Sequence, residues 1–167
     1  MKTVAAPELT SLISPGKVGI RARMPEGHTI HRIARDHSRD FVGQQLTVIS
    51  PQGRFATGAR KLNGRTLESV DAHGKHLCYH WSNGKLLHIH LGLYGKFRGH
   101  RTPAPEPRGQ VRLRVIGHQK GFDLNGPNAC ELVTKKNWLA IRTRLGEDPL
   151  RADSDSERAW SRISRSR

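Results

Sequence analysis

The segment that follows residue 26 carries mostly apolar positions at steps of three and four. These positions are Ile30, Ile33, Ala34, His37 and Phe41. The spacing predicts an amphipathic helix, with arginines falling largely off its apolar face. Pro25 stands just before it, a favoured place for proline, and Gly43 is a natural stop.

Beyond residue 45 the pattern changes to the alternation that is typical of β-strands. A short β-prone run at residues 46–49 ends at Pro51. Two alternating runs, residues 76–81 and 86–91, flank Asn83-Gly84. Asn-Gly between two such runs is the strongest short signal of a β-hairpin.

A further strand is expected at residues 111–115, where valine and leucine alternate with Arg112 and Arg114 to give one apolar and one basic face. Several short strands separated by turns suggest a sandwich or barrel. We therefore expect a mainly β fold with flanking helices (α+β). It would be a two-layered β-sandwich with an N-terminal helix, followed by the start of a helical domain.

The helical part is expected from residue 135 onward. Residues 135–145 are predicted to form a helix, residues 146–150 a break, and the chain from Asp155 a basic amphipathic helix that carries Trp160 and Ile163. The expected divisions are a leader or an upstream-misplaced start at 1–23, a sandwich domain at 24–145, and a helical domain, only begun, at 146–167.

The net charge of +15 is extreme for 167 residues, and the basic residues are spread along the whole chain. For a folded domain this favours a nucleic-acid partner. The alternatives are a ribosome-associated protein or a basic surface without a specific partner. No apolar run in the sequence approaches the length of a membrane span, and no secretory signal is recognisable. We expect a cytoplasmic, nucleoid-associated protein.

The cysteines and several histidines are candidate metal ligands. Cys78 and Cys130 are isolated, so they predict small buried residues rather than a disulfide framework or a zinc ribbon. Five histidines gather on the predicted hairpin: His73, His76, His80, His88 and His90. Strand alternation allows a cross-strand pair, but a zinc site needs four converging ligands, and we expect no metal site.

The strongest candidate chemistry lies in Met24-Pro25-Glu26-Gly27-His28. If translation began at Met24 and that residue were removed, Pro25 would carry a terminal secondary amine able to attack a sugar carbon and form an iminium. Glu26 places an acid/base group one residue away. The positive end of the following helix dipole would keep more of the amine unprotonated. If Pro25 is internal, it is an ordinary helix-opening proline.

Four motifs in order resemble the formamidopyrimidine-DNA glycosylase/endonuclease VIII family, nearest to its actinobacterial endonuclease VIII branch. They are Met24 to Arg32, His73-Gly74-Lys75-His76-Leu77, His90-Leu91-Gly92-Leu93-Tyr94-Gly95, and Asp123-Leu124-Asn125-Gly126-Pro127. Residues 145–150 and 157–160 resemble the entry to the family's helix-two-turn-helix domain. The resemblance covers residues 24–167.

The resemblance implies a base-excision repair enzyme. Such an enzyme removes an oxidised base from double-stranded DNA and nicks the strand by β,δ-elimination. Pro25 would be the nucleophile, Glu26 the acid/base, and Lys75 a catalytic lysine at DNA phosphate. A flipped-out nucleotide leaves a gap in the stack, which Leu93 and Tyr94 would fill. Lys96 and Arg98, which follow this loop, are also expected to bind DNA.

The family's zinc finger has no counterpart here, so no cofactor is expected in this chain. Three interpretations remain open from the sequence. The first is a glycosylase and AP lyase that acts as a monomer. The second is a catalytically inactive, truncated DNA-binding remnant, because an internal Pro25 has no nucleophilic lone pair. The third is an unrelated basic β protein that binds RNA.

Overall fold

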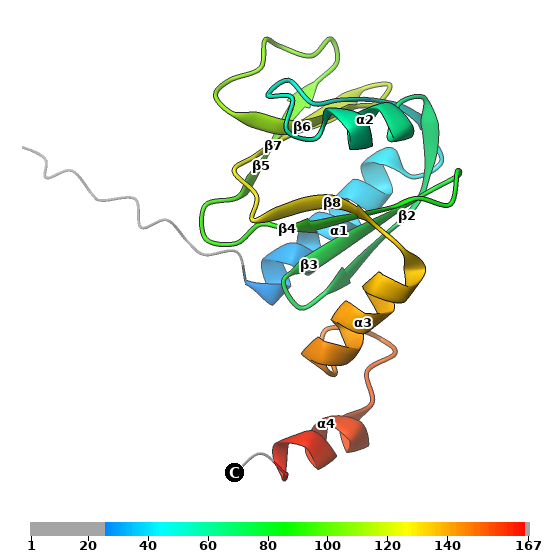
Figure 1. The fold of residues 1–167 in the computed structure, drawn as a ribbon, viewed down its shortest axis with the longest axis vertical. Helices are drawn as coiled ribbons and strands as arrows, with labels where there is room; N and C mark the ends of the chain where they lie inside the picture. Colours follow the sequence, from blue (N-terminus) through cyan, green and yellow to red (C-terminus); the bar gives the residue numbers. More distant parts are fainter. Residues whose placement is uncertain (1–25, 166–167) are drawn as a thin grey trace, which may run out of the picture.

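The computed structural model describes residues 26–165 (Figure 1). Helix α1 spans Gly27–Phe41, as its periodicity predicted. It buries Ile30, Ala34 and Phe41 and leaves its arginines toward solvent. The helix is followed by Gly43, whose φ of 83° lies in the left-handed region that favours glycine. Pro25 lies outside the described residues.

Eight strands form one antiparallel sheet in the order β5-β7-β6-β1-β2-β3-β4-β8. Their bounds are β1 Gln45–Ile49, β2 Arg65–His73, β3 His76–Trp81, β4 Leu86–His90, β5 Lys96–Arg101, β6 Val111–Ile116, β7 Lys120–Asn125 and β8 Ala129–Val133. The predicted hairpin is confirmed as β3 and β4, with Gly84 at a φ of 73° in its turn.

Strand β1 is where the sheet divides into two layers. Its first two residues, Gln45 and Leu46, pair with β2, whereas Thr47, Val48 and Ile49 pair with β6. The chain therefore passes from one layer to the other within five residues. In Figure 1, β5, β6 and β7 lie above, and β2, β3, β4 and β8 lie below with α1 packed against β2 and β3. The predicted mainly β fold with flanking helices is confirmed.

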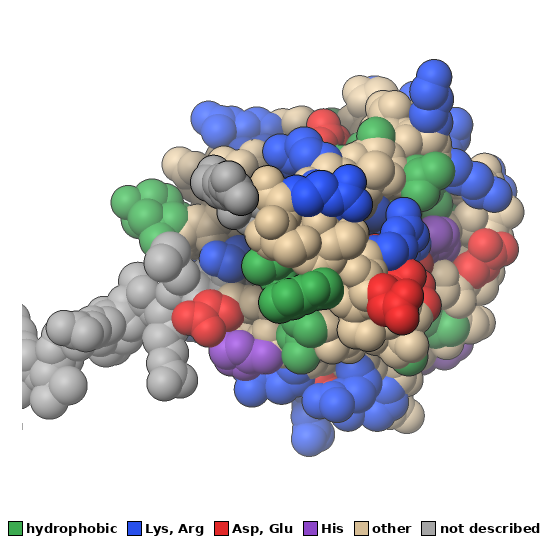
Figure 2. All heavy atoms as spheres, turned by 90° about the horizontal axis from the view of Figure 1, so that it is seen from below, with side chains coloured by type: hydrophobic (Ala, Val, Ile, Leu, Met, Phe, Trp, Pro, Cys, Tyr) green, Lys and Arg blue, Asp and Glu red, His purple; other side chains and the backbone are tan. Residues whose placement is uncertain are grey.

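Two helices follow the sheet, α3 at Lys135–Leu145 and α4 at Ser156–Ile163, close to their predicted positions. Thr134 caps α3 by accepting a hydrogen bond from the Asn137 amide, and Asp155 caps α4 in the same way. Trp138 anchors α3 in a small cluster with Cys78 and Leu86. Figure 2 views this end of the molecule, where Lys and Arg side chains surround a hydrophobic patch. The exposed apolar side chains of α3, α4 and their connection are Leu139, Leu145, Leu150, Trp160 and Ile163.

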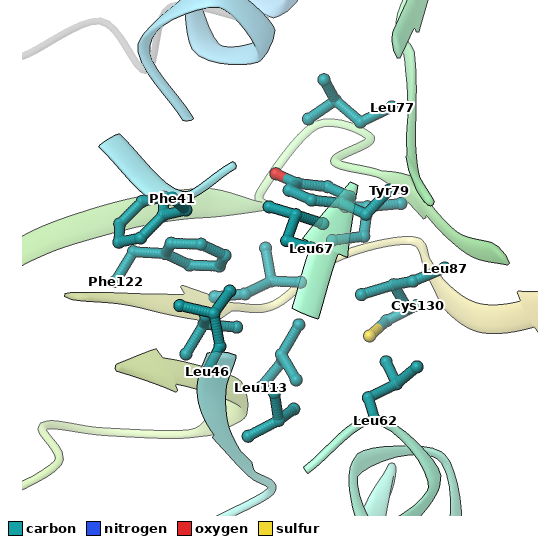
Figure 3. Close-up of a cluster of buried hydrophobic side chains, with 14 of the residues drawn as sticks. Phe41, Leu46, Leu62, Leu67, Leu77, Tyr79, Leu87, Leu113, Phe122 and Cys130 are labelled. Atoms are coloured by element: carbon teal, nitrogen blue, oxygen red, sulfur yellow. The ribbon is translucent and has the colours of Figure 1, made fainter. Parts of the chain in front are cut away.

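The core fills the space between the layers (Figure 3). Leu113 and Phe122 of one layer share it with Leu67, Tyr79 and Leu87 of the other. The two cysteines are buried, as predicted. Burial raises the pKa of each thiol to about 12. Both therefore stay protonated at neutral pH.

Two expectations need correction. Strand β6 has no continuous basic face, because Arg114 is buried and donates to both carboxylate oxygens of Asp123 at 2.6 and 2.8 Å. Helix α2, Ala56–Leu62, was missed. It is only seven residues long and contains Gly58, so its pattern is too short to register as a period.

Among residues 26–165, none of the helices has both the length and the apolar character needed to cross a bilayer.

Candidate functional site

Lys75 lies at the mouth of a cleft of about 430 Å³. It occupies the tight turn between β2 and β3, as predicted, beside Gly74 with a φ of 57°. The lysine side chain is exposed. The cleft is lined by residues of this turn, of β4 and of the α3–α4 connection: His73, Gly74, Lys75, His76, His90, Leu145, Glu147, Asp148 and Pro149.

Glu26 stands at the amino end of α1, and the same turn lies beside it. A Cβ added to Gly27 would lie 3.6 Å from the Gly74 carbonyl oxygen and 3.7 Å from Leu150 Cδ1. The Glu26 side chain is 66% exposed, with Oε2 3.5 Å from His28 Nδ1. Two of the three predicted catalytic residues, Glu26 and Lys75, thus come from neighbouring backbone at one end of the sandwich.

A buried carboxylate, Asp148, joins these two elements. Its Oδ2 accepts hydrogen bonds from the Gly74 amide and from His31 Nε2, both at 2.7 Å, and its Oδ1 accepts one from the Leu150 amide at 3.0 Å. Burial raises the pKa of Asp148, but these three donors outweigh it and the pKa lies below its usual range. From the sequence, Asp148 was only part of the predicted break and of the family-like segment 145–150, and no role was assigned to it.

Histidines form the wall of the cleft behind Lys75. His76 stacks on His90 at 4.4 Å, and its Nδ1 lies 2.9 Å from Nε2 of His88. Nδ1 of His88 lies 3.2 Å from Glu131 Oε1. Burial, then the neighbouring His90 and His88, lowers the pKa of His76 to about 4.

Strand alternation allowed a cross-strand histidine pair, and the structure pairs His76 with His90. However, the His76 and His88 nitrogens face each other rather than a common centre. No group of three or more His, Cys, Asp or Glu side chains in residues 26–165 is arranged to hold a metal ion.

The loop between β4 and β5 presents Leu93 and Tyr94 to solvent, 47% and 79% exposed. Core packing is therefore excluded for both. Gly95 lets the chain turn back closely, because a Cβ there would lie 2.2 Å from the Leu91 carbonyl oxygen. The loop holds an apolar and an aromatic side chain outward on a constrained backbone.

A second cleft, of about 390 Å³ and lined by basic side chains, extends from this loop along β5. Tyr94, Lys96 and Arg98 line it, together with Arg108 from the β5–β6 loop. Asn125 holds that loop by donating to the Arg108 carbonyl oxygen at 3.2 Å. Arg108 was not singled out from the sequence, since a lone arginine in a proline-rich loop carries no local signal.

Comparison with known proteins assigns the chain to a family. The sequence model of the formamidopyrimidine-DNA glycosylase N-terminal domain matches residues 24–125. The chain belongs to this family. The resemblance inferred from the sequence motifs is confirmed.

Curated relatives agree. Endonuclease 8 1 of Mycobacterium tuberculosis (strain ATCC 25618 / H37Rv) is 51% identical over 148 residues, which is 86% of this chain and 55% of the relative. Formamidopyrimidine-DNA glycosylase of Marinobacter nauticus is 28% identical over 143 residues, 82% of this chain and 52% of the relative. The chain thus spans about half the length of the curated relatives that it matches.

Solved structures show the same fold. Lactococcus lactis formamidopyrimidine-DNA glycosylase bound to DNA containing an AP site superposes with a TM-score of 0.62 at 20% identity, covering 77% of this chain and 53% of that one. MutM in complex with DNA containing carbocyclic 8-oxo-G superposes with a TM-score of 0.65 at 19% identity, covering 80% and 54%.

Proposed function

We propose that this chain forms the catalytic half of a DNA repair glycosylase with AP lyase activity, acting as a monomer on duplex DNA that carries an oxidised base. The main support is that Gly27, the residue after Glu26, lies against the Gly74–Lys75 turn that lines the cleft. The exposed Leu93–Tyr94 loop and the basic cleft beyond it supply the other parts that DNA repair chemistry needs. We expect the protein to work in the nucleoid.

The proposed reaction starts at the Pro25 nitrogen, which must be a free secondary amine. It attacks the anomeric carbon of the damaged nucleotide, the base leaves, and Glu26 protonates the ring oxygen as the sugar opens to the iminium. Loss of a proton from the neighbouring sugar carbon then expels the 3′ phosphate, and a second elimination expels the 5′ phosphate. Lys75 would contact the phosphate beside the reacting sugar.

The nucleotide must leave the stack before it can reach Glu26. Leu93 and Tyr94 would enter the vacated step, where an apolar wedge offsets part of the cost of unstacking. Lys96 and Arg98 would hold phosphates next to the wedge. The constrained loop keeps the wedge rigid, so little entropy is lost when DNA binds.

An inactive DNA-binding protein is the second candidate. It would apply if Pro25 stays internal in the working protein, because its nitrogen would then be a tertiary amide. The charge and the wedge would still serve DNA binding in that case.

Borohydride trapping on a duplex with one abasic site separates the two. We would compare the 167-residue chain, a chain that starts at Met24, and the latter with its terminal amine acetylated. A covalent adduct is expected with the Met24 chain after methionine removal, and none after acetylation. The variant Pro25→Gly keeps an amine and should retain part of the trapping. Absence of an adduct with every form, while DNA binding persists, would establish the inactive alternative.

A further inference from the structure

The connection between α3 and α4 is fastened to the end of β2. Three consecutive β2 and turn residues each make one hydrogen bond to it. The pairs are Arg151 Nη1 to the Ala72 oxygen at 2.8 Å, His73 Nε2 to the Gly146 oxygen at 2.7 Å, and the Gly74 amide to Asp148 Oδ2 at 2.7 Å. These bonds join segments more than 70 residues apart in the chain.

Asp148 is the member of this connection that also reaches α1. Its side chain is 5% exposed, and Oδ2 receives both the Gly74 amide and His31 Nε2. Gly74 directly precedes Lys75, and His31 lies five residues after Glu26 in the first turns of α1. One oxygen atom therefore links the backbone beside Lys75 to the helix that begins at Glu26.

From this geometry we infer that Asp148 is a positioning residue for the reaction proposed above: it holds the Gly74–Lys75 turn against the amino end of α1, so that Lys75 and Glu26 meet the same sugar. The inference rests on the proposed function. Neighbouring Glu147 cannot take this part, since its Oε2 accepts from the Asp155 amide and its Oε1 lies 3.9 Å from Arg158 Nε, on the α4 side.

Chemistry makes the role specific to a carboxylate. The two carboxylate oxygens of Asp148 together accept hydrogen bonds from three donors. An asparagine has one acceptor oxygen and an NH₂ group that would point a donor at another donor. Asp148→Asn therefore keeps the size of the side chain but leaves either the Leu150 amide, or the Gly74 amide and His31 Nε2 together, facing an NH₂ donor instead of an acceptor. The turn should loosen while the core stays packed.

The test compares Asp148→Asn with Asp153→Asn, a control in the same connection. Asp153 is exposed and pairs with Arg151 and Arg142. Arg151 also donates to the Ala72 oxygen, but Asp153→Asn keeps that arginine and both hydrogen bonds on Asp148 Oδ2. Amide hydrogen exchange on the 167-residue chain is the first readout. We expect Asp148→Asn to raise exchange of the Gly74 and Lys75 amides by about tenfold, with β3 and β4 amides unchanged. Asp153→Asn should match the wild type in this turn.

Nicking of abasic DNA is the second readout, measured on the 167-residue and Met24-starting chains. A displaced catalytic group costs turnover rather than binding, so kcat of Asp148→Asn should fall by roughly 10²-fold while KM stays within about threefold. His31→Gln should show a smaller loss of kcat, since Asp148 would still hold the Gly74 amide. Wild-type kcat in Asp148→Asn, or unchanged exchange at the turn, would overturn the inference.

The positioning role of Asp148 and the proposed function can fail independently, and the results distinguish the two failures. If the wild type traps and nicks but Asp148→Asn does the same at full rate, only the positioning role fails. If no form of the wild type traps, the proposed function fails, and hydrogen exchange alone decides whether Asp148 holds the turn. Exchange that rises through the whole core would assign Asp148 to general stability and also overturn the positioning role.

Discussion

His37 is a half-buried histidine that packs against aromatic side chains of the core. Its ring stacks on Phe122 at 4.4 Å, and its Nδ1 lies 2.7 Å from the hydroxyl oxygen of Tyr79. Burial lowers the pKa of His37 to about 4, although Asp40 and Asp36 act in the opposite direction. At neutral pH the ring is therefore uncharged, and one hydrogen bond satisfies the buried polar pair.

This pKa predicts a stability that depends on pH. In the unfolded chain His37 titrates near its ordinary 6.5, so between pH 6.5 and 4 the unfolded state binds more protons than the folded state. The free energy of unfolding should fall as the pH is lowered through this window, by up to about 3 kcal/mol from His37. His76, with its pKa also near 4, contributes in the same direction.

Urea unfolding at a series of pH values measures this dependence. The variant His37→Gln keeps a polar partner for Tyr79 but does not titrate. Between pH 6.5 and 4, its unfolding should therefore take up about one proton fewer, and its unfolding free energy should depend less steeply on pH. Tyr79→Phe is the matched control: it removes the hydrogen bond and keeps the titrating ring, so it should lower stability without flattening the curve. If His37→Gln leaves the pH dependence of the unfolding free energy unchanged, the prediction for His37 is wrong.

Among the secondary-structure elements, those with a sustained period were predictable and those without one were not. Helix α1 repeats its apolar face over four turns, and the β3–β4 hairpin has both alternation and an Asn-Gly turn. Strand β5, with the sequence KFRGHR, carries almost no apolar alternation, because it lies at the edge of the sheet. Its place is set by pairing with β7, which no local pattern records.

The β4–β5 loop depends on Gly95 for its shape. A Cβ at this position would lie 2.2 Å from the Leu91 oxygen and 2.7 Å from its Cα, so Gly95→Ala must push the loop away from its conformation. We expect this variant to lose preference for a lesion-bearing duplex over an undamaged one by about tenfold, because Leu93 and Tyr94 shift together. Fluorescence anisotropy with both duplexes measures the ratio.

Gly99→Ala serves as the control for this prediction. It lies in β5, five residues from Tyr94, and a Cβ there meets no atom within 4 Å. Its preference for the lesion-bearing duplex should equal that of the wild type. Equal ratios for both variants would argue that the loop conformation does not govern recognition of the lesion.

At the scale of the whole molecule, the fold brings together groups that the sequence keeps far apart. Family motifs pointed to Glu26 and Lys75 separately, but Asp148 is 74 residues from Gly74 and 117 from His31. The basic cleft likewise joins Arg108 of the β5–β6 loop to Lys96 and Arg98 of β5. Neither grouping follows from periodicity. The first depends on where the α3–α4 connection docks, and the second depends on the pairing of β5 with β7 and on the hydrogen bond from Asn125 to the β5–β6 loop.

The net charge of +15 predicts that binding to duplex DNA weakens steeply with salt. Each phosphate contact adds about 0.9 to the slope of log Kobs against log salt concentration. If Arg108 holds a phosphate in the basic cleft, Arg108→Gln should reduce this slope by about 0.9 and weaken binding to damaged and undamaged duplexes alike. Lys61→Gln, in a separate cleft beside α2, should leave the slope unchanged. Equal slopes for Arg108→Gln and the wild type would remove Arg108 from the DNA-binding surface, and a loss confined to the damaged duplex would instead mean that Arg108 reads the lesion.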